Sequence, residues 1–176
     1  LPMLTRAELL GQIMRNYDTP VAISGTHGKT TTTSMVSHIL LAGDCDPTIS
    51  VGGILPAIGG NIRVGNSETF VTEACEYTNS FLSFFPKISI ILNMDADHLD
   101  FFKDIDDIRH SFRRFAELLP ADGTLIINAD TPKYEDIIRD LPCNVITYGL
   151  EHDADYQAAD ITYDKYGHAS FSVLRN

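Results

Sequence analysis

Residues 21–31 read Val-Ala-Ile-Ser-Gly-Thr-His-Gly-Lys-Thr-Thr, and this stretch decides the fold. A short apolar run leads into a turn that contains Gly25 and Gly28. A helix-compatible segment then runs from Lys29 to residue 42, and Gly43 ends it, as glycine commonly ends helices. The order of strand, glycine-rich turn and helix predicts an α/β unit with a ligand-binding loop at the start of the helix.

The chemistry of this loop suits a phosphate group. Gly25 and Gly28 let the backbone curl so that several N–H groups point into one concavity, at a helix N-terminus whose dipole favours an anion. Lys29 would neutralise charge on the β- and γ-phosphates, and the Thr30 hydroxyl would ligate Mg²⁺. The predicted phosphate-binding residues are Gly25, Thr26, His27, Gly28, Lys29, Thr30 and Thr31.

The loop departs from the general phosphate-loop pattern G-x-x-x-x-G-K-[ST]. The residue five positions before Gly28 is Ile23, and the first glycine, Gly25, stands only three positions before Gly28. The alternative interpretation is a glycine-containing turn before a threonine-rich helix start. Strand, turn and helix in the correct order favour the phosphate loop over that alternative.

Five further short apolar runs are bounded by turn residues, at 48–51, 69–72, 88–92, 125–127 and 145–148. Helical patterns lie between several of them. Continuous apolar strands with intervening helices are typical of a parallel sheet that is covered on both faces. The sequence therefore predicts an α/β fold of P-loop type, with a mostly parallel sheet flanked by helices.

The clearest helix outside the loop covers residues 105–119, where apolar residues recur at steps of three and four. A short amphipathic helix is predicted over residues 4–17, because Thr5 and Glu8 have the spacing of a capping box. Residues 156–174 alternate polar with apolar residues around turn signals at 164 and 167, which predicts a small C-terminal β-hairpin.

Composition and charge exclude several classes of protein. The 176 residues are 44% hydrophobic and 21% charged, which is too apolar for disorder and about the size of one domain. Thirteen basic against 24 acidic residues give a formal charge of −11, so the surface as a whole repels nucleic acid and anionic lipid. We predict neither nucleic acid nor membrane as a partner.

The expected location is the cytoplasm. No apolar run approaches the roughly 18 residues that a membrane span needs, and the N-terminus lacks the pattern of a signal peptide. The three cysteines are an odd number without a C-x-x-C pair, which argues against a disulfide framework or a structural zinc site. Because the sequence begins with Leu1 rather than Met, we expect a piece of a longer protein.

The loop and five other segments together resemble the Mur ligase family, the ATP-dependent amide ligases of bacterial cell-wall synthesis. The loop has the spacing G-T-x-G-K-T of that family. The other segments are VGG at 51–53, GGN at 59–61, EACE at 73–76, NMDADHLD at 93–100 and ITYG at 146–149. Taken in order over about 150 residues, these motifs are far more specific than any one of them.

This resemblance implies the central, ATP-binding domain of a three-domain enzyme. Residues 1–18 would be a lead-in helix from an N-terminal domain that holds the UDP-sugar. Residues 19–176 would be the central domain, incomplete at its C-terminal end, and a C-terminal domain would close over the nucleotide. The implied cofactors are ATP and Mg²⁺.

Within the family, His27 before the second glycine resembles the branch that joins L-alanine to UDP-N-acetylmuramate through an acyl phosphate. Several relatives in other branches carbamylate a lysine on the helix after residue 100. No lysine occurs from residue 104 to residue 132, which favours the alanine-adding branch. Another member, such as the ligase that recycles murein tripeptide, is the alternative within the family.

Acidic residues near the loop are candidate metal ligands. Glu73 ends a predicted strand, and Mg²⁺ prefers carboxylate and phosphate oxygens together. In similar ligases this glutamate binds magnesium, but Glu76 could serve instead. A further possibility is that either acid only precedes a short helix. Cys75 and Tyr77 stand where the family often has Asp and Ser, so the contacts around the site stay open.

The segment 93–100 follows the strand predicted at 88–92, at the sheet edge where open α/β sheets bind ligands. The resemblance implies that His98 ligates a second Mg²⁺, whereas a single loop histidine is otherwise usually solvated. The resemblance also places Asn93 near the acyl phosphate. The predicted catalytic residues are Lys29, His98 and Asn93, and the predicted metal ligands are Thr30, Glu73 and His98.

Two other functions compete with the ligase. A nucleotide-dependent switch or kinase would need a base-specificity motif or a substrate-phosphate site, and the sequence contains neither. A nucleotide-binding module that is inactive alone is the other alternative. Addition of ATP with Mg²⁺, followed by muramate substrate and alanine, separates these possibilities.

Overall fold

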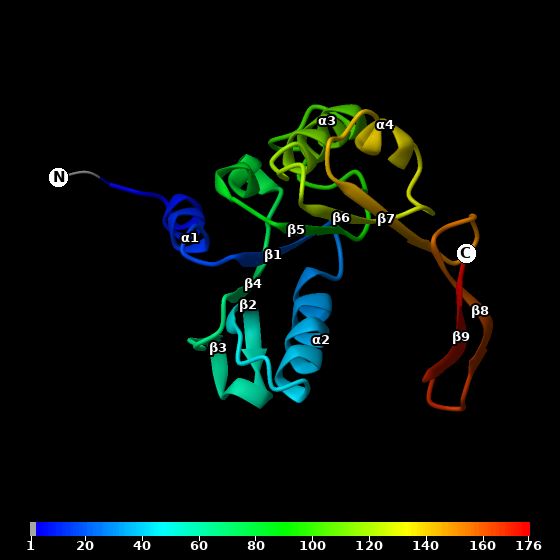
Figure 1. Ribbon diagram of the computed structural model, residues 1–176. Helices are drawn as coiled ribbons and strands as arrows, with labels where there is room; N and C mark the ends of the chain where they lie inside the picture. Colours follow the sequence, from blue (N-terminus) through cyan, green and yellow to red (C-terminus); the bar gives the residue numbers. More distant parts are fainter. Residues whose placement is uncertain (1–2) are drawn as a thin grey trace.

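The computed structural model describes residues 3–176, and its framework is a single sheet (Figure 1). Within this part of the chain the sheet has nine strands in the order β3-β2-β4-β1-β5-β6-β7-β8-β9. The strands are β1 (Thr19–Ser24), β2 (Thr48–Leu55), β3 (Gly60–Arg63), β4 (Thr69–Glu73), β5 (Ile88–Ile91), β6 (Thr124–Asn128), β7 (Asn144–Gly149), β8 (Tyr156–Tyr163) and β9 (Ala169–Arg175).

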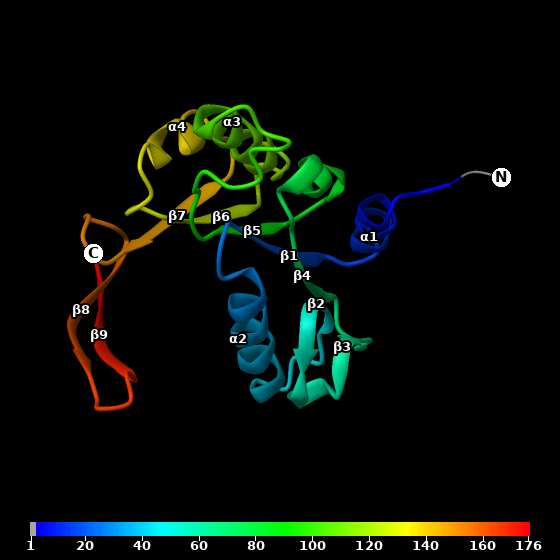
Figure 2. The same ribbon diagram turned by 180° about the vertical axis from the view of Figure 1, so that it is seen from behind.

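Helices lie on both faces of the sheet, and all but the first of them connect two strands. They are α1 (Arg6–Met14), α2 (Lys29–Ala42), α3 (Ile105–Ala116) and α4 (Tyr134–Ile138), with two 3₁₀ segments, η1 (Pro56–Ile58) and η2 (Tyr77–Ser83). Both views show α2 on the side of the sheet opposite to α3 and α4 (Figures 1 and 2). None of these helices, in residues 3–176, is long and apolar enough to cross a membrane.

Strand β1 lies at the centre and carries the phosphate loop. It pairs in parallel with β4 on one side and β5 on the other. Five of its six residues are buried, as expected for a strand covered on both faces. Among the strands of residues 3–176, only β2–β3 and β8–β9 pair antiparallel. The prediction of a mostly parallel sheet flanked by helices, with a C-terminal hairpin, is confirmed.

Two apolar cores form because alternate residues of β1 point to opposite faces. Ala22 packs in the larger core, which includes Phe81 of η2 and Phe112 and Phe115 of α3. Val21 and Ile23 pack on the other face against α2. The central strand is therefore fixed from both sides, and its carboxyl end holds the loop in place.

The structure differs from the sequence expectations at several boundaries. Helix α1 covers a shorter range than 4–17, although the Thr5–Glu8 capping box forms. The helix predicted over 105–119 ends as α3 at Ala116, because the last residues turn toward β6. The glycine-rich segment 59–61 continues into β3, an antiparallel edge strand that the sequence analysis did not predict. Helix α4 was not predicted either.

Asp130, in the turn after β6, forms hydrogen bonds with the turn after β7. Its carboxylate accepts hydrogen bonds from the backbone N–H groups of Leu150 (2.6 Å), Glu151 (3.1 Å) and His152 (2.9 Å). His152 Nδ1 also lies 3.0 Å from the carboxylate. Partial burial raises the pKa of Asp130, but these hydrogen bonds favour the charged form more strongly and lower the pKa to about 2.

We expect Asp130→Asn to lower the free energy of unfolding by about 1–2 kcal/mol at pH 7. The folded-state pKa lies below the unfolded value of about 3.9, so this stability is present above pH 4. It is lost as the pH falls through 4 toward 2. Urea denaturation of both proteins at several pH values measures the difference. Asp136→Asn, at an exposed ion pair with Arg139, should change stability by less than about 0.5 kcal/mol. A difference for Asp130→Asn that is constant with pH would contradict the assignment.

Candidate active site

Two glycines give the loop its shape. Gly25 has φ +144° and Gly28 has φ +84°, which are backbone conformations that side chains disfavour. A Cβ at Gly25 would also lie 2.9 Å from the Cβ of Leu92 and 3.2 Å from the backbone nitrogen of Asn93. The loop therefore packs closely against the end of β5 and turns directly into the N-terminus of α2.

The segment after β5 forms a wall that holds the loop. The backbone N–H of His27 donates to Asn93 Oδ1 (2.8 Å), and Asn93 Nδ2 donates to the carbonyl of His27 (3.0 Å). The backbone N–H of Thr26 donates to the carbonyl of Asn93 (3.2 Å), and the N–H of Asp95 donates to Thr26 Oγ1 (2.9 Å). Asn93 thus positions the loop, while its predicted contact with an acyl phosphate stays a prediction.

The ammonium of Lys29 lies inside the loop. It donates to the carbonyls of Gly25 (2.5 Å) and Thr26 (3.2 Å), and it contacts both carboxylate oxygens of Glu76 at 3.0 and 3.2 Å. The side chain of Glu76 is only 2% exposed and that of Lys29 is 17% exposed. His98 Nε2 lies 3.9 Å from Glu76 Oε1. Lys29 and His98 therefore approach the same buried carboxylate, and sequence reasoning did not foresee this ion pair.

Backbone turns place Glu76 and His98 in this arrangement. Glu76 directly precedes η2, in which Thr78 (φ 55°) and Asn79 (φ 57°) are left-handed. His98 is also left-handed, and its ring lies against the ring of Tyr77 with a centroid distance of 4.6 Å. The hydroxyl of Tyr77 donates to Asp100 Oδ2 (2.7 Å), and this hydrogen bond raises the pKa of Tyr77. Tyr77 thereby joins the two segments that carry Glu76 and His98.

Glu73 lies at the end of β4, beside the glycine pair Gly52–Gly53 of β2. Its Oε1 accepts a hydrogen bond from the backbone N–H of Gly52 (2.6 Å), and a Cβ at Gly52 would lie 2.8 Å from its Oε2. A Cβ at Gly53 would lie 3.4 Å from the methyl group of Thr30. The Gly52–Gly53 pair therefore lets Glu73 and Thr30 approach neighbouring points of the same strand.

The side chains of Thr30, Glu73 and His98 suit a hard cation that keeps phosphate and water ligands. The described residues contain no cluster of three or more His, Cys, Asp or Glu side chains that could hold a metal ion. Mg²⁺ is commonly bound through one or two protein oxygens together with substrate phosphates and water. The hydroxyl of Thr30 and the carboxylate of Glu73 are oxygens of that kind, and His98 offers a nitrogen next to a buried carboxylate.

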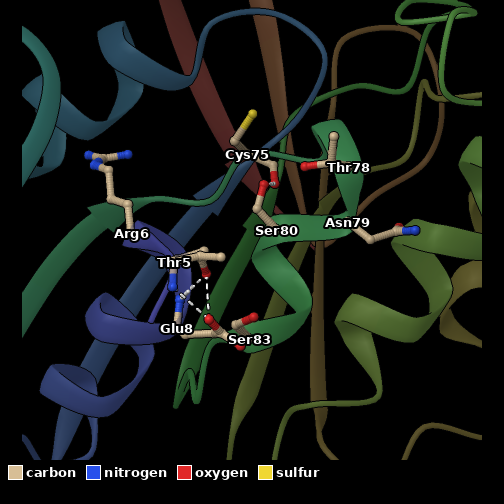
Figure 3. Close-up of a pocket in the computed structure, with 9 residues that line it drawn as sticks. Thr5, Arg6, Glu8, Cys75, Thr78, Asn79, Ser80 and Ser83 are labelled. Atoms are coloured by element: carbon tan, nitrogen blue, oxygen red, sulfur yellow. Dashed lines mark hydrogen bonds between the residues drawn. The ribbon is translucent and has the colours of Figure 1, made fainter. Parts of the chain in front are cut away.

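A cavity of about 510 Å³, lined mainly by polar residues, lies between α1 and η2 (Figure 3). Figure 3 shows Arg6 on α1 and Cys75 and Ser80 on the opposite side of this cavity. A smaller cavity of about 90 Å³ shares Arg6, Cys75 and Ser80 and is also lined by Glu73 and Gly52. The cavities thus extend from α1 to the carboxylate of Glu73. The sequence analysis did not single out Arg6, because an exposed arginine in a first helical turn carries no distinctive signal.

Comparison with known proteins identifies the family to which this arrangement belongs. The family model described as the Mur ligase middle domain matches residues 23–175. The chain belongs to the Mur ligase family. Mur ligases are ATP-dependent ligases, and the resemblance predicted from the motifs is confirmed.

Individual relatives agree with the family assignment. The chain is 65% identical over 177 residues to UDP-N-acetylmuramate–L-alanine ligase of Lachnospira eligens, covering 100% of this chain and 39% of the relative. It is 62% identical over 175 residues to the same-named ligase of Agathobacter rectalis, covering 99% of this chain and 38% of the relative. The chain therefore spans about two fifths of the length of these curated relatives.

Solved structures show the same fold. UDP-N-acetylmuramate-alanine ligase from Thermotoga maritima superposes with a TM-score of 0.77 at 26% identity, covering 94% of this chain and 36% of that one. UDP-N-acetylmuramate:L-alanyl-gamma-D-glutamyl-meso-diaminopimelate ligase from Neisseria meningitides superposes with a TM-score of 0.86 at 26% identity. That match covers 99% of this chain and 57% of the other.

Proposed function

We propose that this chain is the central, nucleotide-binding domain of an ATP-dependent ligase that joins L-alanine to UDP-N-acetylmuramate. The observation that carries the proposal is identity above 60%, over almost the whole chain, to ligases named for that reaction. The proposed domain organisation is a lead-in helix over residues 1–18 and the central domain over residues 19–176. The proposal includes flanking N- and C-terminal domains, since the relatives are more than twice as long as this chain. The proposed location of the enzyme is the cytoplasm.

The proposed reaction has two steps. The lactyl carboxylate of UDP-N-acetylmuramate attacks the γ-phosphorus of ATP, which forms an acyl phosphate and releases ADP. The amine of L-alanine then attacks the acyl carbon, which forms the amide and releases phosphate. Neither step needs a covalent bond to the protein, so positioning and charge neutralisation supply the catalysis, and Cys75 has no nucleophilic role.

The residues of the loop take the following proposed roles. The backbone N–H groups of residues 28–31 face the phosphates at the N-terminus of α2, where the helix dipole favours anions, whereas those of Thr26 and His27 are bonded to Asn93. Lys29 holds the transferring phosphoryl group and stabilises the charge that develops on it. Asn93 keeps the loop in the shape that these contacts need, through its hydrogen bonds to His27.

Thr30, Glu73 and His98 are the proposed ligands of Mg²⁺. When bound, Mg²⁺ would neutralise phosphate charge and orient the phosphoryl group for in-line transfer. The Thr30 hydroxyl lies at the start of α2 on the phosphate loop, and Glu73 lies beside the glycine pair that approaches Thr30. His98 is held against Tyr77, so its ring faces the same buried carboxylate as Lys29.

A second candidate is a ligase that adds a peptide instead of a single amino acid. The observation that favours it is the TM-score of 0.86 to the ligase whose name specifies an L-alanyl-γ-D-glutamyl-meso-diaminopimelate substrate. Sequence identity to that protein is only 26%, compared with 62–65% to the alanine ligases. The alanine-adding reaction is therefore the stronger proposal.

The experiment is a phosphate-release assay on the full-length enzyme that contains this domain. ATP, Mg²⁺ and UDP-N-acetylmuramate are combined with L-alanine, glycine, L-serine or the tripeptide, and the product is identified by mass. We expect release that depends on L-alanine and a product larger by one alanyl residue. Release that depends only on the tripeptide would establish the second candidate, and release with none of these acceptors would reject both.

A further inference from the structure

Glu76 is a buried carboxylate whose charge depends on a single close cation. In the part of the chain that the structure describes, Lys29 is the only lysine or arginine within 4.0 Å of it. The remaining neighbour is His98, whose Nε2 lies 3.9 Å away. A buried charge that loses its partner is strongly unfavourable, so the state of Lys29 governs the free energy of Glu76.

Phosphate binding in the loop would disturb this pair. The inference rests on the proposed function, in which Lys29 neutralises the β- and γ-phosphates. When the ammonium turns toward those phosphates, Glu76 is left beside new negative charge in a poorly solvated position. Coulomb repulsion between like charges at such short distances is large away from bulk water. A nucleotide without a metal ion would therefore compete with Glu76 for the same ammonium.

We propose that Glu76 makes nucleotide binding dependent on a divalent cation, because its carboxylate must receive a second positive charge when phosphates draw Lys29 away. The carboxylate offers two oxygens, and the imidazole of His98, with Nε2 3.9 Å from Glu76 Oε1, offers a nitrogen that can ligate a metal ion. Glu76 thereby selects the metal complex of a nucleoside triphosphate over the free nucleotide. It acts on the substrate through Lys29 and is a positioning residue.

Glu73 does not share this property, although it is a predicted metal ligand together with Thr30 and His98. Its carboxylate is partly exposed and accepts a hydrogen bond from Gly52, and no lysine, arginine or histidine lies within 4.0 Å of it among the described residues. Movement of the Lys29 ammonium would leave these contacts unchanged. Replacement of Glu76 is therefore expected to change the binding of nucleotide without metal, and replacement of Glu73 is not, which makes the two glutamates a matched pair for an experiment.

The first test measures ATP affinity of the full-length enzyme by calorimetry, once with EDTA and once with Mg²⁺. Glu76→Gln keeps the shape and removes the charge. We expect metal-free ATP to bind about tenfold more tightly than to the wild type, and the gain in affinity from Mg²⁺ to shrink by about tenfold. Glu73→Gln should leave metal-free affinity within about twofold and reduce only the gain from Mg²⁺.

The outcomes separate this inference from the proposed function. A wild-type enzyme that binds ATP neither with nor without Mg²⁺ would reject the proposed function itself. If the wild type binds ATP with Mg²⁺, but Glu76→Gln binds ATP less tightly than the wild type both with EDTA and with Mg²⁺, only the inference is overturned. In that case Glu76 would simply orient Lys29.

The second test does not depend on the Glu76→Gln variant alone. Lys29→Met leaves the carboxylate of Glu76 without its ammonium, so Mn²⁺ without nucleotide should bind about tenfold more tightly than to the wild type. Free Mn²⁺ is measured by electron paramagnetic resonance. This increase in Mn²⁺ affinity should be absent in Lys29→Arg, which keeps the positive charge. It should also be absent in the double variant Lys29→Met/Glu76→Gln, which lacks the carboxylate. Equal Mn²⁺ affinity of wild type and Lys29→Met would overturn the inference.

Discussion

Lys29→Met in the full-length enzyme is expected to lower kcat/KM for ATP by about 10³-fold or more, which corresponds to about 4 kcal/mol. The ammonium is the only lysine or arginine charge that the described structure places in the loop, where it contacts two loop carbonyls and Glu76. In phosphoryl transfer the protein contributes mainly position and positive charge, so loss of this group removes a large share of both. Phosphate release at varied ATP concentration measures the loss.

Lys87→Met provides the matched control for this prediction. Lys87 precedes β5 and forms an ion pair with Asp122, away from the loop. The same substitution there should change kcat/KM by less than about twofold, because exposed ion pairs contribute little. If Lys29→Met retained activity within tenfold of the wild type, the loop would not be the site of phosphoryl transfer.

Much of the fold can be predicted from sequence where local chemistry and packing agree. The helix expected from Lys29 to residue 42 is α2 with the same bounds, because the loop glycines fix its start and Gly43 its end. The runs at 69–72 and 125–127 lie within β4 and β6, since the residues of both strands are buried or half-buried and read as apolar segments. These elements need no information from distant parts of the chain.

Other elements depend on partners that no local pattern specifies. Strand β3 exists because residues 60–63 pair with β2 at the edge of the sheet, although the segment GGN has low strand propensity. Helix α4 has only five residues and packs against α3. Segment η2 is kinked at two left-handed residues, Thr78 and Asn79, and neither is a glycine. Tertiary contacts decide all three.

In the candidate active site, too, some features follow from local sequence and others depend on distant contacts. The sequence places Lys29, Thr30 and Glu73 at strand and helix ends, and the structure has them there. The sequence alone does not specify which of the two glutamates in the segment EACE, Glu73 or Glu76, is buried. The structure has Glu76 buried against Lys29 and Glu73 partly exposed beside Gly52. The kink in η2 and the approach of residues 93–100 decide this orientation, and both are set by contacts distant in sequence.

The polypeptide of residues 1–176 alone is expected to bind nucleotide weakly and to form no detectable amide bond. This chain spans 38–39% of the length of two alanine ligases to which it is 62–65% identical. Ligation requires a UDP-sugar carboxylate, a phosphoryl group and an amine in one geometry from which water is excluded. Positioning of reactants can contribute roughly 7–11 kcal/mol of barrier lowering. The phosphate loop of this chain positions only one of the three.

The test compares the purified chain with the full-length enzyme for phosphate release and for formation of UDP-N-acetylmuramoyl-alanine. Circular dichroism first establishes that the chain is folded, as the complete apolar cores on both faces of the sheet lead us to expect. Lys29→Ala in the same chain controls for contaminating ligase, since its loss of the loop ammonium should remove any turnover that belongs to this domain. Turnover by the folded chain comparable to that of the full-length enzyme, and abolished by Lys29→Ala, would show that this domain positions all three reactants itself. The cavity beside Arg6 and Glu73 would then have to hold the UDP-sugar without help from a flanking domain.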